Sequence, residues 1–273
     1  MNPLDVQRAL VEEILVRFLR TEAGKFGFRR GVLGLSGGID SAVSCALAAR
    51  AFGPENVLAV MMPYRTSSPE SLADAERVAK STGVTTRRID ISPMVDGYVE
   101  TCDVSDPTRR GNVMARARMI VLYDLSVEWK GLVVGTSNKT ELLLGYSTQF
   151  GDSASALNPI GDLYKHQVFQ LARHLGLPEE VLAKPPSADL VAGQTDEADL
   201  GFTYAEADRL LDLLVERRMG ESELVAAGFD PAFVDRVVRR IVLNQYKRIP
   251  PIICKLGNRT INQDFRYLRS WKH

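Results

Sequence analysis

The sequence predicts an α/β protein built on a doubly wound parallel sheet with helices on both faces. In the first half of the chain, short strand-like segments alternate with longer segments of helical pattern. Repeated strand–helix–strand crossovers require parallel strands, and helices then cover both faces of the sheet. The chain has 273 residues, of which 45% are hydrophobic and 25% charged, so it is long enough to bury a substantial core.

Four short segments are predicted as the strands of this sheet. The first contains the apolar run GVLGL, the second is NVLAVMM, and the last is GLVVGT. Apolar runs of this length are typical of strands buried on both faces. The predicted strands are residues 32–36, 56–62, 85–91 and 131–136.

Helices are predicted between and after these strands, and an amphipathic helix carrying acidic residues opens the chain. Ser68 followed by Pro69 indicates the start of one helix, and Val113, Ala117 and Ile120 recur at helical spacing in another. The predicted helices are residues 40–52, 68–82 and 112–130, followed in the second half by 164–175, 204–218 and 231–246.

Residues 184–197 contain too many Pro, Gly and short polar residues to form a regular element. A loop of this length in a compact protein is often a lid over a site, and we expect residues 184–200 to form one. The sequence shows no internal repeat, low-complexity tract or linker. We therefore expect a single domain over residues 1–273.

Charge and cysteine content narrow the classes of function. Thirty-four basic and 34 acidic side chains give zero formal net charge, which argues against a broad nucleic-acid-binding surface. No apolar run approaches the length of a membrane span, and the acidic opening helix is unlike a signal peptide. Cys45, Cys102 and Cys254 are odd in number and lack metal-site spacing, which favours the reducing cytoplasm. Cys45 lies in an apolar helix and is expected to be buried.

The stretch GLSGGIDSA, residues 34–42, joins the first strand to the next helix. It is not a Walker loop, because no Lys-Ser or Lys-Thr follows the glycines, and it lacks the G-x-G-x-x-G spacing of dinucleotide sites. One interpretation is an ordinary turn in which Ser36 or Asp40 caps the helix. The other is a pyrophosphate site made of backbone amides and hydroxyls at a helix N-terminus. Asp40 would then be a Mg²⁺ ligand, since a metal removes the repulsion between carboxylate and phosphate.

The pattern S-G-G-x-D-S after a strand resembles the pyrophosphate loop of the ATP pyrophosphatases, which cleave ATP between its α and β phosphates. Further segments resemble, in order, the signatures of the NAD synthetase family within that superfamily, and the resemblance covers essentially the whole chain. It implies a Rossmann-like fold of the adenine nucleotide alpha-hydrolase type. The segments are GTSNKTE (135–141), GYSTQFGD (145–152), KPPSADL (184–190), DE (196–197), LGFTY (200–204) and KRIPP (247–251).

The resemblance implies a ligase that forms a C–N bond and depends on ATP and Mg²⁺. In that family, nicotinic acid adenine dinucleotide (deamido-NAD) is activated by ATP as an acyl-adenylate, with release of pyrophosphate. Ammonia then displaces AMP to give NAD. The family also implies a homodimer whose interface completes the dinucleotide site.

Several residues of the implied ATP site also have simpler interpretations. Glu141 stands three residues after Asn138, as in a capping box, whereas in the family it is a metal ligand together with Asp40. Lys165 lies at a helix start, where a cation opposes the helix dipole, and the family uses the matching lysine on phosphate. The implied ATP-binding residues are Gly34, Leu35, Ser36, Gly37, Gly38, Ile39, Asp40, Ser41, Thr136, Lys165 and Ser187.

A second set of residues is implied to bind deamido-NAD. Arg116 lies in a helix crowded with arginines, which on pattern alone is usually a solvated face, and it matches the family's dinucleotide-binding arginine. Many bacterial ammonia-dependent members carry lysine, aspartate and histidine where this chain has Gln149, Ala156 and Tyr246. The implied substrate residues are Arg116, Gln149, Asp152, Tyr246 and Lys247.

Two rival classes are disfavoured. A tRNA-modifying ATP pyrophosphatase would have a basic surface, and a non-catalytic nucleotide-binding protein would lack the carboxylates of Asp40 and Glu141. We expect free ammonia to be the nitrogen donor. The family segments leave no length for a glutamine amidase, and none of the three cysteines suits its nucleophile.

Overall fold

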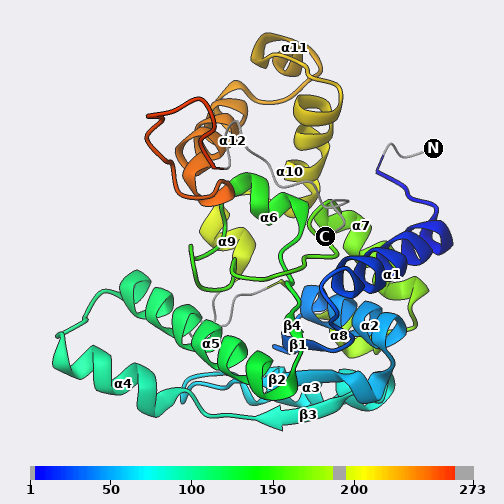
Figure 1. The fold of residues 1–273 in the computed structure, drawn as a ribbon. Coiled ribbons are helices and arrows are strands. Elements are labelled where there is room, and N and C mark those ends of the chain that lie inside the picture. Colours follow the sequence, from blue (N-terminus) through cyan, green and yellow to red (C-terminus); the bar gives the residue numbers. More distant parts are fainter. Residues whose placement is uncertain (1–3, 187–194, 262–273) are drawn as a thin grey trace.

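A parallel four-stranded sheet forms the centre of the protein (Figure 1). The computed structural model describes residues 4–186 and 195–261. The strand order is β3-β2-β1-β4. This confirms the predicted α/β fold with a parallel sheet. The strands are β1 (Gly31–Gly34), β2 (Val57–Met61), β3 (Thr85–Arg88) and β4 (Leu132–Val133).

The direction of the chain through the sheet reverses beside β1. Successive strands first run outward from β1 to β2 and β3, and the chain then returns to add β4 on the other side of β1. In register, Gly31 lies opposite both Val57 of β2 and Leu132 of β4. Sites in such sheets form beyond the carboxyl ends of the strands at this reversal point. The glycine-rich turn therefore begins at the position where a ligand is expected.

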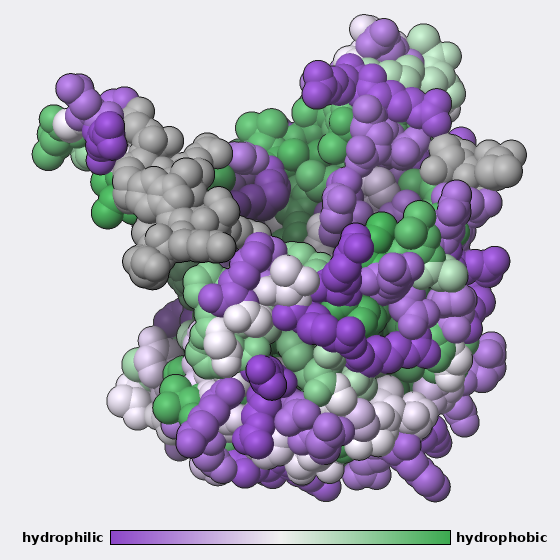
Figure 2. Space-filling view, turned by 45° about the vertical axis from the view of Figure 1, so that its right-hand side comes forward, coloured by the Kyte–Doolittle hydropathy of each residue, from purple (hydrophilic) through white to green (hydrophobic). Residues whose placement is uncertain are grey.

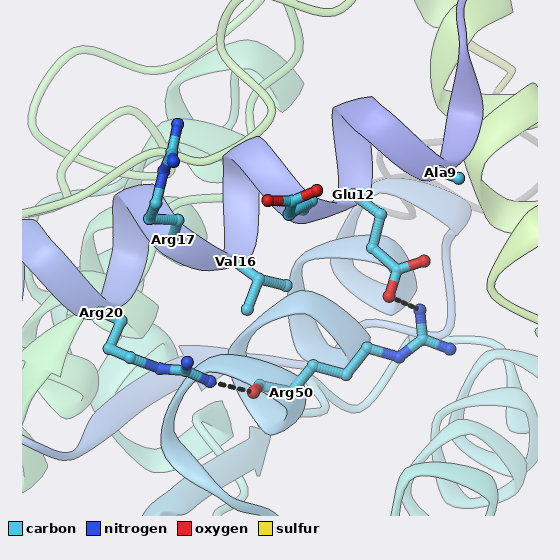
Figure 3. A pocket seen from close by; sticks show the side chains of 7 residues that line it. Ala9, Glu12, Val16, Arg17, Arg20 and Arg50 are labelled. Atoms are coloured by element: carbon cyan, nitrogen blue, oxygen red, sulfur yellow. Dashed lines mark hydrogen bonds and ion pairs between the residues drawn. The ribbon is translucent and has the colours of Figure 1, made fainter.

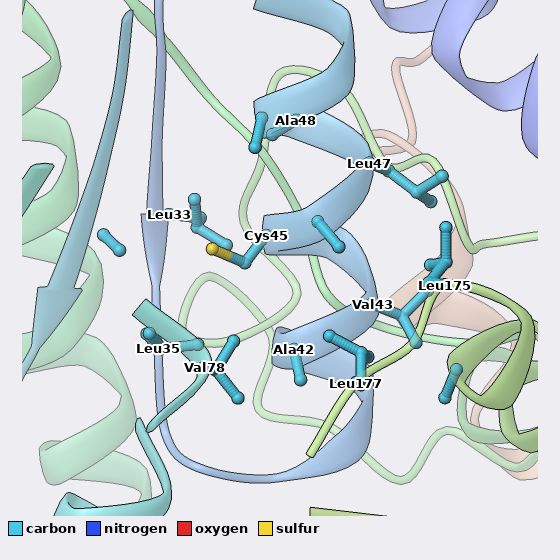
Figure 4. Close-up of a cluster of buried hydrophobic side chains, with 14 of the residues drawn as sticks. Leu33, Leu35, Ala42, Val43, Cys45, Leu47, Ala48, Val78, Leu175 and Leu177 are labelled. Carbon is cyan, nitrogen blue, oxygen red and sulfur yellow. The ribbon is translucent and has the colours of Figure 1, made fainter. Parts of the chain in front are cut away.

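Helices cover both faces of the sheet. Leu33 and Ala59 belong to an apolar cluster with α2, whereas Val32 and Leu58 pack into a different cluster with α4 and α5. This alternation is the period of two that places successive strand side chains on opposite faces. Figure 4 shows the first cluster around Cys45 and Leu47 of α2. Its helices are α1 (Arg8–Gly24), α2 (Ile39–Phe52), α3 (Pro69–Thr82), α7 (Lys165–His174) and α8 (Glu179–Ala183); those on the other face are α4 (Ser92–Thr101) and α5 (Pro107–Trp129).

A third apolar cluster is made by helices from the second half of the chain. Tyr164, which precedes α7, belongs to this cluster, whereas Val168 of α7 belongs to the cluster on the sheet, so α7 joins the two. The face shown in Figure 2 is largely hydrophilic, and hydrophobic side chains gather beside the right-hand upper projection. The helices are α6 (Lys139–Leu144), α9 (Asp196–Leu200), α10 (Tyr204–Leu211), α11 (Glu221–Ala226) and α12 (Pro231–Leu243), with a 3-10 turn at Gln245–Arg248.

The element bounds differ from the predicted ones in informative ways. The helix predicted to start at 112 begins at Pro107, because the Asp106 side chain accepts a hydrogen bond from the Arg109 amide and caps it. The helix predicted over 204–218 ends as α-helix at Leu211 and continues as a π-turn at Asp212–Glu216. Short helices α4, α8, α9 and α11 were not predicted, since segments of five to ten residues show little periodicity.

The strands are shorter than predicted, and Ser36 and Thr136 lie beyond the ends of β1 and β4. Next to β4, Val134 forms a parallel bridge with Leu157. No helix within the described ranges is both long and apolar enough to span a membrane. The single-domain assignment stays a prediction.

Cys45 provides a test of the packing around α2. Its side chain is fully buried, and burial raises the pKa of the thiol to about 11. At pH 8 only about one such thiol in a thousand is ionised, so alkylation is expected to be very slow in the folded protein. Cys102 and Cys254 are exposed and are expected to react. Peptide mapping after iodoacetamide treatment, with guanidinium-unfolded protein as control, checks this. Equal labelling of Cys45 and Cys102 in folded protein would show that the packing is wrong.

Candidate functional site

The turn between β1 and α2 is held by its own hydroxyls. Ser41 Oγ accepts a hydrogen bond from the Ser36 amide (3.2 Å) and donates to the Gly38 carbonyl (2.9 Å). Ser36 Oγ accepts from the Gly38 amide (3.2 Å) and lies 3.1 Å from Ser41 Oγ. Since the Ser41 proton is directed to Gly38, Ser36 is the donor between the two hydroxyls. The turn is therefore fixed at the N-terminus of α2.

Gly37 is required in this turn. Its φ is +84°, and a Cβ there would lie 2.1 Å from the Ser71 carbonyl oxygen. Any side chain would collide with the start of α3 as well as strain the backbone. The glycine thus lets the turn approach α3 closely, which the ordinary-turn interpretation does not require. At the end of β1, the Leu35 amide donates to Val60 of β2 (2.9 Å).

Asp40 lies in the first turn of α2, where the helix dipole favours a negative charge. It does not cap its own helix. Its Oδ1 accepts from Asn138 Nδ2 (2.8 Å), and its Oδ2 accepts from Lys165 Nζ (2.5 Å). The carboxylate is therefore held by two residues that lie 98 and 125 positions later in the chain.

Glu141 forms the predicted capping box and also contacts Lys165. Its Oε2 accepts from the Asn138 amide (3.2 Å), and the Glu141 amide donates to Asn138 Oδ1 (2.9 Å), which completes a capping box on α6. Its Oε1 accepts from Lys165 Nζ (3.2 Å). Burial, and then the charge of Asp40, raises the pKa of Glu141 to about 8 against the opposing effect of Lys165.

Lys165 is the shared partner of the two carboxylates. It is the first residue of α7 and is only 2% exposed. Burial alone would lower the pKa of Lys165, but the charges of Asp40 and Glu141 outweigh burial and raise it. Its ammonium also lies 4.8 Å from the centre of the Tyr204 ring, a cation–π contact.

The two carboxylates of Asp40 and Glu141 lie around the same ammonium. Both converge on one point, the Lys165 ammonium, and carboxylate oxygens are the ligands that Mg²⁺ prefers. Among the residues that the structure describes, no group of three or more His, Cys, Asp or Glu side chains could hold a metal. Two protein carboxylates with the remaining positions left to phosphate or water is the usual arrangement for Mg²⁺.

The predicted dinucleotide residues gather around the loop at 145–152. Arg116 of α5 donates to the Gln149 carbonyl (3.3 Å and 3.4 Å), and Asp152 accepts from the Thr148 amide (2.6 Å). Lys247 Nζ donates to the carbonyls of Gly145 (2.7 Å) and Ser147 (2.8 Å). Burial lowers the pKa of Lys247. Four of the five predicted residues thus hold or belong to one loop.

The remaining predicted residues are less engaged. Thr136 is half-buried just beyond β4, and Tyr246 is 52% exposed on the 3-10 turn. Ser187 and the rest of residues 187–194 of the predicted lid lie outside the described residues, and the last five residues of that lid form α9 instead of an irregular loop. At the start of the predicted lid, Lys184 Nζ donates to Ser71 Oγ (2.9 Å) and lies 3.0 Å from Asp74 Oδ2.

The partners that orient these side chains are not revealed by local sequence patterns. Asn138 was noted as a cap, but its amide also bonds Asp40, a contact between segments that no local pattern reveals. Asp196 accepts from the hydroxyls of Tyr146 (3.1 Å) and Tyr204 (3.1 Å), beside Lys165. In the sequence, Asp196 was indicated only by the DE segment (196–197) of the family resemblance.

A separate groove lies between α1 and α2 (Figure 3). Three of its charged side chains are paired or hydrogen-bonded: Arg50 pairs with Glu12 (2.6 Å), and Arg20 donates to the carbonyl of residue 50 (3.0 Å). Arg50 is at the C-terminal end of α2, opposite the glycine turn. The groove is therefore part of helix packing, away from the site.

Known proteins share this fold and the whole length of the chain. The model of the family described as NAD synthase matches residues 11–251. An NH(3)-dependent NAD(+) synthetase of Chlorobium phaeobacteroides is 58% identical over 269 residues, covering 98% of this chain and 97% of that protein.

Two solved structures are also similar. An NMN synthetase from Francisella tularensis has a TM-score of 0.82 and 30% identity. An NH3-dependent NAD synthetase from Campylobacter jejuni has a TM-score of 0.79 and 33% identity. In each case the match covers 92% of this chain and 100% of the other. With a family match over most of its length, the chain belongs to the NAD synthase family.

Proposed function

We infer that this protein is a ligase that converts deamido-NAD to NAD with ammonia and ATP, releasing AMP and pyrophosphate. Full-length relatives named NH(3)-dependent NAD(+) synthetase support this activity. The observation that carries it is the convergence of Asp40, Glu141 and Lys165 beside the glycine turn at the carboxyl end of β1. This site has both anion-binding amides and cation-binding carboxylates, as a magnesium–nucleotide complex requires.

The reaction has two steps. A nicotinate oxygen attacks the α-phosphorus of ATP, forming an acyl-adenylate while the bond to pyrophosphate breaks. Ammonia then attacks the acyl carbon, AMP leaves with the former carboxylate oxygen, and a proton is released. Activation is needed because oxide is a very poor leaving group, whereas AMP leaves readily.

We assign the ATP residues as follows. Amides and hydroxyls of residues 34–41 bind the pyrophosphate part of ATP at the start of α2. Asp40 and Glu141 hold Mg²⁺, which supplies neutralising charge to the phosphate oxygens when bound. Lys165 contacts phosphate, and its fixed position at the start of α7 avoids reorganisation as charge develops. Thr136 and Ser187 complete the ATP site.

We assign deamido-NAD to the surface around residues 145–152. Arg116, Gln149, Asp152, Tyr246 and Lys247 are the proposed contacts. Arg116 and Tyr246 are exposed, so both are accessible to a large substrate. The planar guanidinium of Arg116 suits a carboxylate or phosphate.

A homodimer is proposed on the exposed side of α5. Ile120, Tyr123 and Val127 are exposed hydrophobics at spacings of three and four, so they form one stripe of the helix. Arg116 begins the same stripe. A second copy packed on this stripe would therefore lie next to the proposed dinucleotide site. The free thiols Cys45, Cys102 and Cys254 support a cytoplasmic location.

The activity is tested by mass spectrometry of products after incubation with ATP, Mg²⁺, ammonium and deamido-NAD. Formation of NAD, AMP and pyrophosphate in equal amounts is expected. Because one similar structure is an NMN synthetase, nicotinic acid mononucleotide should be compared as substrate. Faster conversion of the mononucleotide would overturn the assignment of deamido-NAD.

Asp40→Asn is predicted to reduce turnover by roughly 100-fold or more, as for loss of one preorganised charge-stabilising group. The amide preserves the shape and can still accept from Asn138, but it loses the ion pair with Lys165, so folding is measured beside turnover. Circular dichroism and pyrophosphate release measure the two effects. Glu55→Gln, in the 3-10 turn before β2 at the opposite edge of the sheet, serves as the control. Near-normal turnover in folded Asp40→Asn would remove the metal-ligand assignment.

Free ammonia is predicted to be the nitrogen donor. Burial and a raised pKa make Cys45 unsuitable as an amidase nucleophile. Kinetics with ammonium or with ammonia-free glutamine as sole donor test this, and the rate with ammonium should rise with pH as more NH₃ becomes available. Comparable rates with glutamine would reveal an amidase site in the chain.

Val127→Glu is predicted to weaken the dimer, because a carboxylate would be placed on the apolar stripe of α5. Light scattering should show a shift toward monomer, and the KM for deamido-NAD should rise. Leu10→Glu, at an exposed apolar position on α1, is the control. A mass unchanged by Val127→Glu would place the interface elsewhere.

A further inference from the structure

We infer that Asp208 of α10 is a positioning residue for the reaction, because it binds the immediate neighbours of both Glu141 and Lys165. The inference rests on the site roles proposed above for those two residues. Asp208 itself belongs to a helix 40 or more residues further along the chain, and nothing in the local sequence around it indicates a functional site.

Asp208 is fully buried and both of its carboxylate oxygens are engaged. Oδ1 accepts from Thr140 Oγ1 (2.5 Å), and Oδ2 accepts from the His166 amide (2.8 Å). The Thr140 hydroxyl in turn accepts from the Lys165 amide (3.0 Å). A single carboxylate therefore ties the first turn of α6, which carries Glu141, to the first turn of α7, which carries Lys165.

The start of α7 needs such an external partner. The first amides of a helix have no partner within the helix, and a short polar side chain at the N-cap usually accepts from them. Tyr164 occupies the N-cap position, and its hydroxyl instead donates to Glu216 and to the Leu211 carbonyl. Thr140 and Asp208 take over the capping of Lys165 and His166.

The same helix also contacts the other end of Lys165. Tyr204 lies one turn before Asp208 on α10, and residues four apart share a helix face. Its ring lies 4.8 Å from Lys165 Nζ, while Asp208 acts on the Lys165 backbone through Thr140. Helix α10 therefore helps to position both the backbone and the ammonium of Lys165.

The position of Lys165 relative to Asp40 and Glu141 therefore depends on the Asp208 contacts. Loss of these bonds would let the first turn of α7 shift. The Lys165 ammonium would then be displaced relative to the carboxylates of Asp40 and Glu141. Small displacements of a catalytic group reduce the chemical step much more than they reduce substrate binding. The expected signature is a fall in kcat with little change in the KM for deamido-NAD.

Asp208→Asn is the direct test, with Asp212→Asn as the matched control. Asp212 lies one turn further along the same segment and pairs with Arg217 (3.2 Å), so its change perturbs the helix without touching Thr140 or His166. At a temperature where both are folded, Asp208→Asn should lower the kcat for pyrophosphate release by about 10- to 100-fold. Asp212→Asn should stay within about threefold of the unaltered protein.

Thr140 provides a second test if Asp208→Asn does not fold. Thr140→Val keeps the shape but removes the hydroxyl, and should reproduce the fall in kcat. Thr140→Ser keeps the hydroxyl and should restore the rate. If Thr140→Val and Thr140→Ser are equally active, or Asp208→Asn behaves like Asp212→Asn, the inference is overturned.

Lys165→Ala and Glu141→Gln, assayed in parallel, separate this inference from the proposed function. If both keep normal turnover, the proposed site roles fail and the inference falls with them. If both lose turnover while Asp208→Asn and Thr140→Val keep it, the proposed function stands and the positioning role alone is wrong.

Discussion

The ion cluster of Lys165 with Asp40 and Glu141 is the constraint on which the arrangement of the site depends. Its members come from α7, α2 and α6, so these three helices must meet beside β1. Buried charges are costly unless they are paired, and removing one partner from a buried pair typically costs about 3–5 kcal/mol. The cluster therefore ties the glycine turn of the first half to the helical second half.

The charges in this cluster do not cancel: with both carboxylates ionised, two negative groups surround one ammonium. The site thus attracts a further cation, while the dipole of α2 favours an anion at its N-terminus. A magnesium–phosphate group carries both a cation and an anion, so it would satisfy both preferences. Burial, and after it the charge of Asp40, raises the pKa of Glu141.

Local patterns predicted the parts of the site that depend on local chemistry. The turn with Gly37 and Asp40 follows from glycine, hydroxyl and carboxylate spacing. The distance from Asn138 predicted only the capping role of Glu141, and its place in the site was implied by the family resemblance. The bond from Asn138 to Asp40 and the capping of α7 by Asp208 could not be predicted, because they join segments 98 and 42 residues apart. The π-turn after Leu211 and the short helices likewise depend on packing rather than on periodicity.

Asn138 shows why capping and function need not be alternatives at Glu141. A carboxylate has two oxygens, and the capping box uses only Oε2, which leaves Oε1 directed to Lys165. The Asn138 side chain has a carbonyl and an amide, and it caps α6 with the first while orienting Asp40 with the second. One residue thus fixes both carboxylates. Helix capping and the orientation of both acids therefore depend on the same side chain.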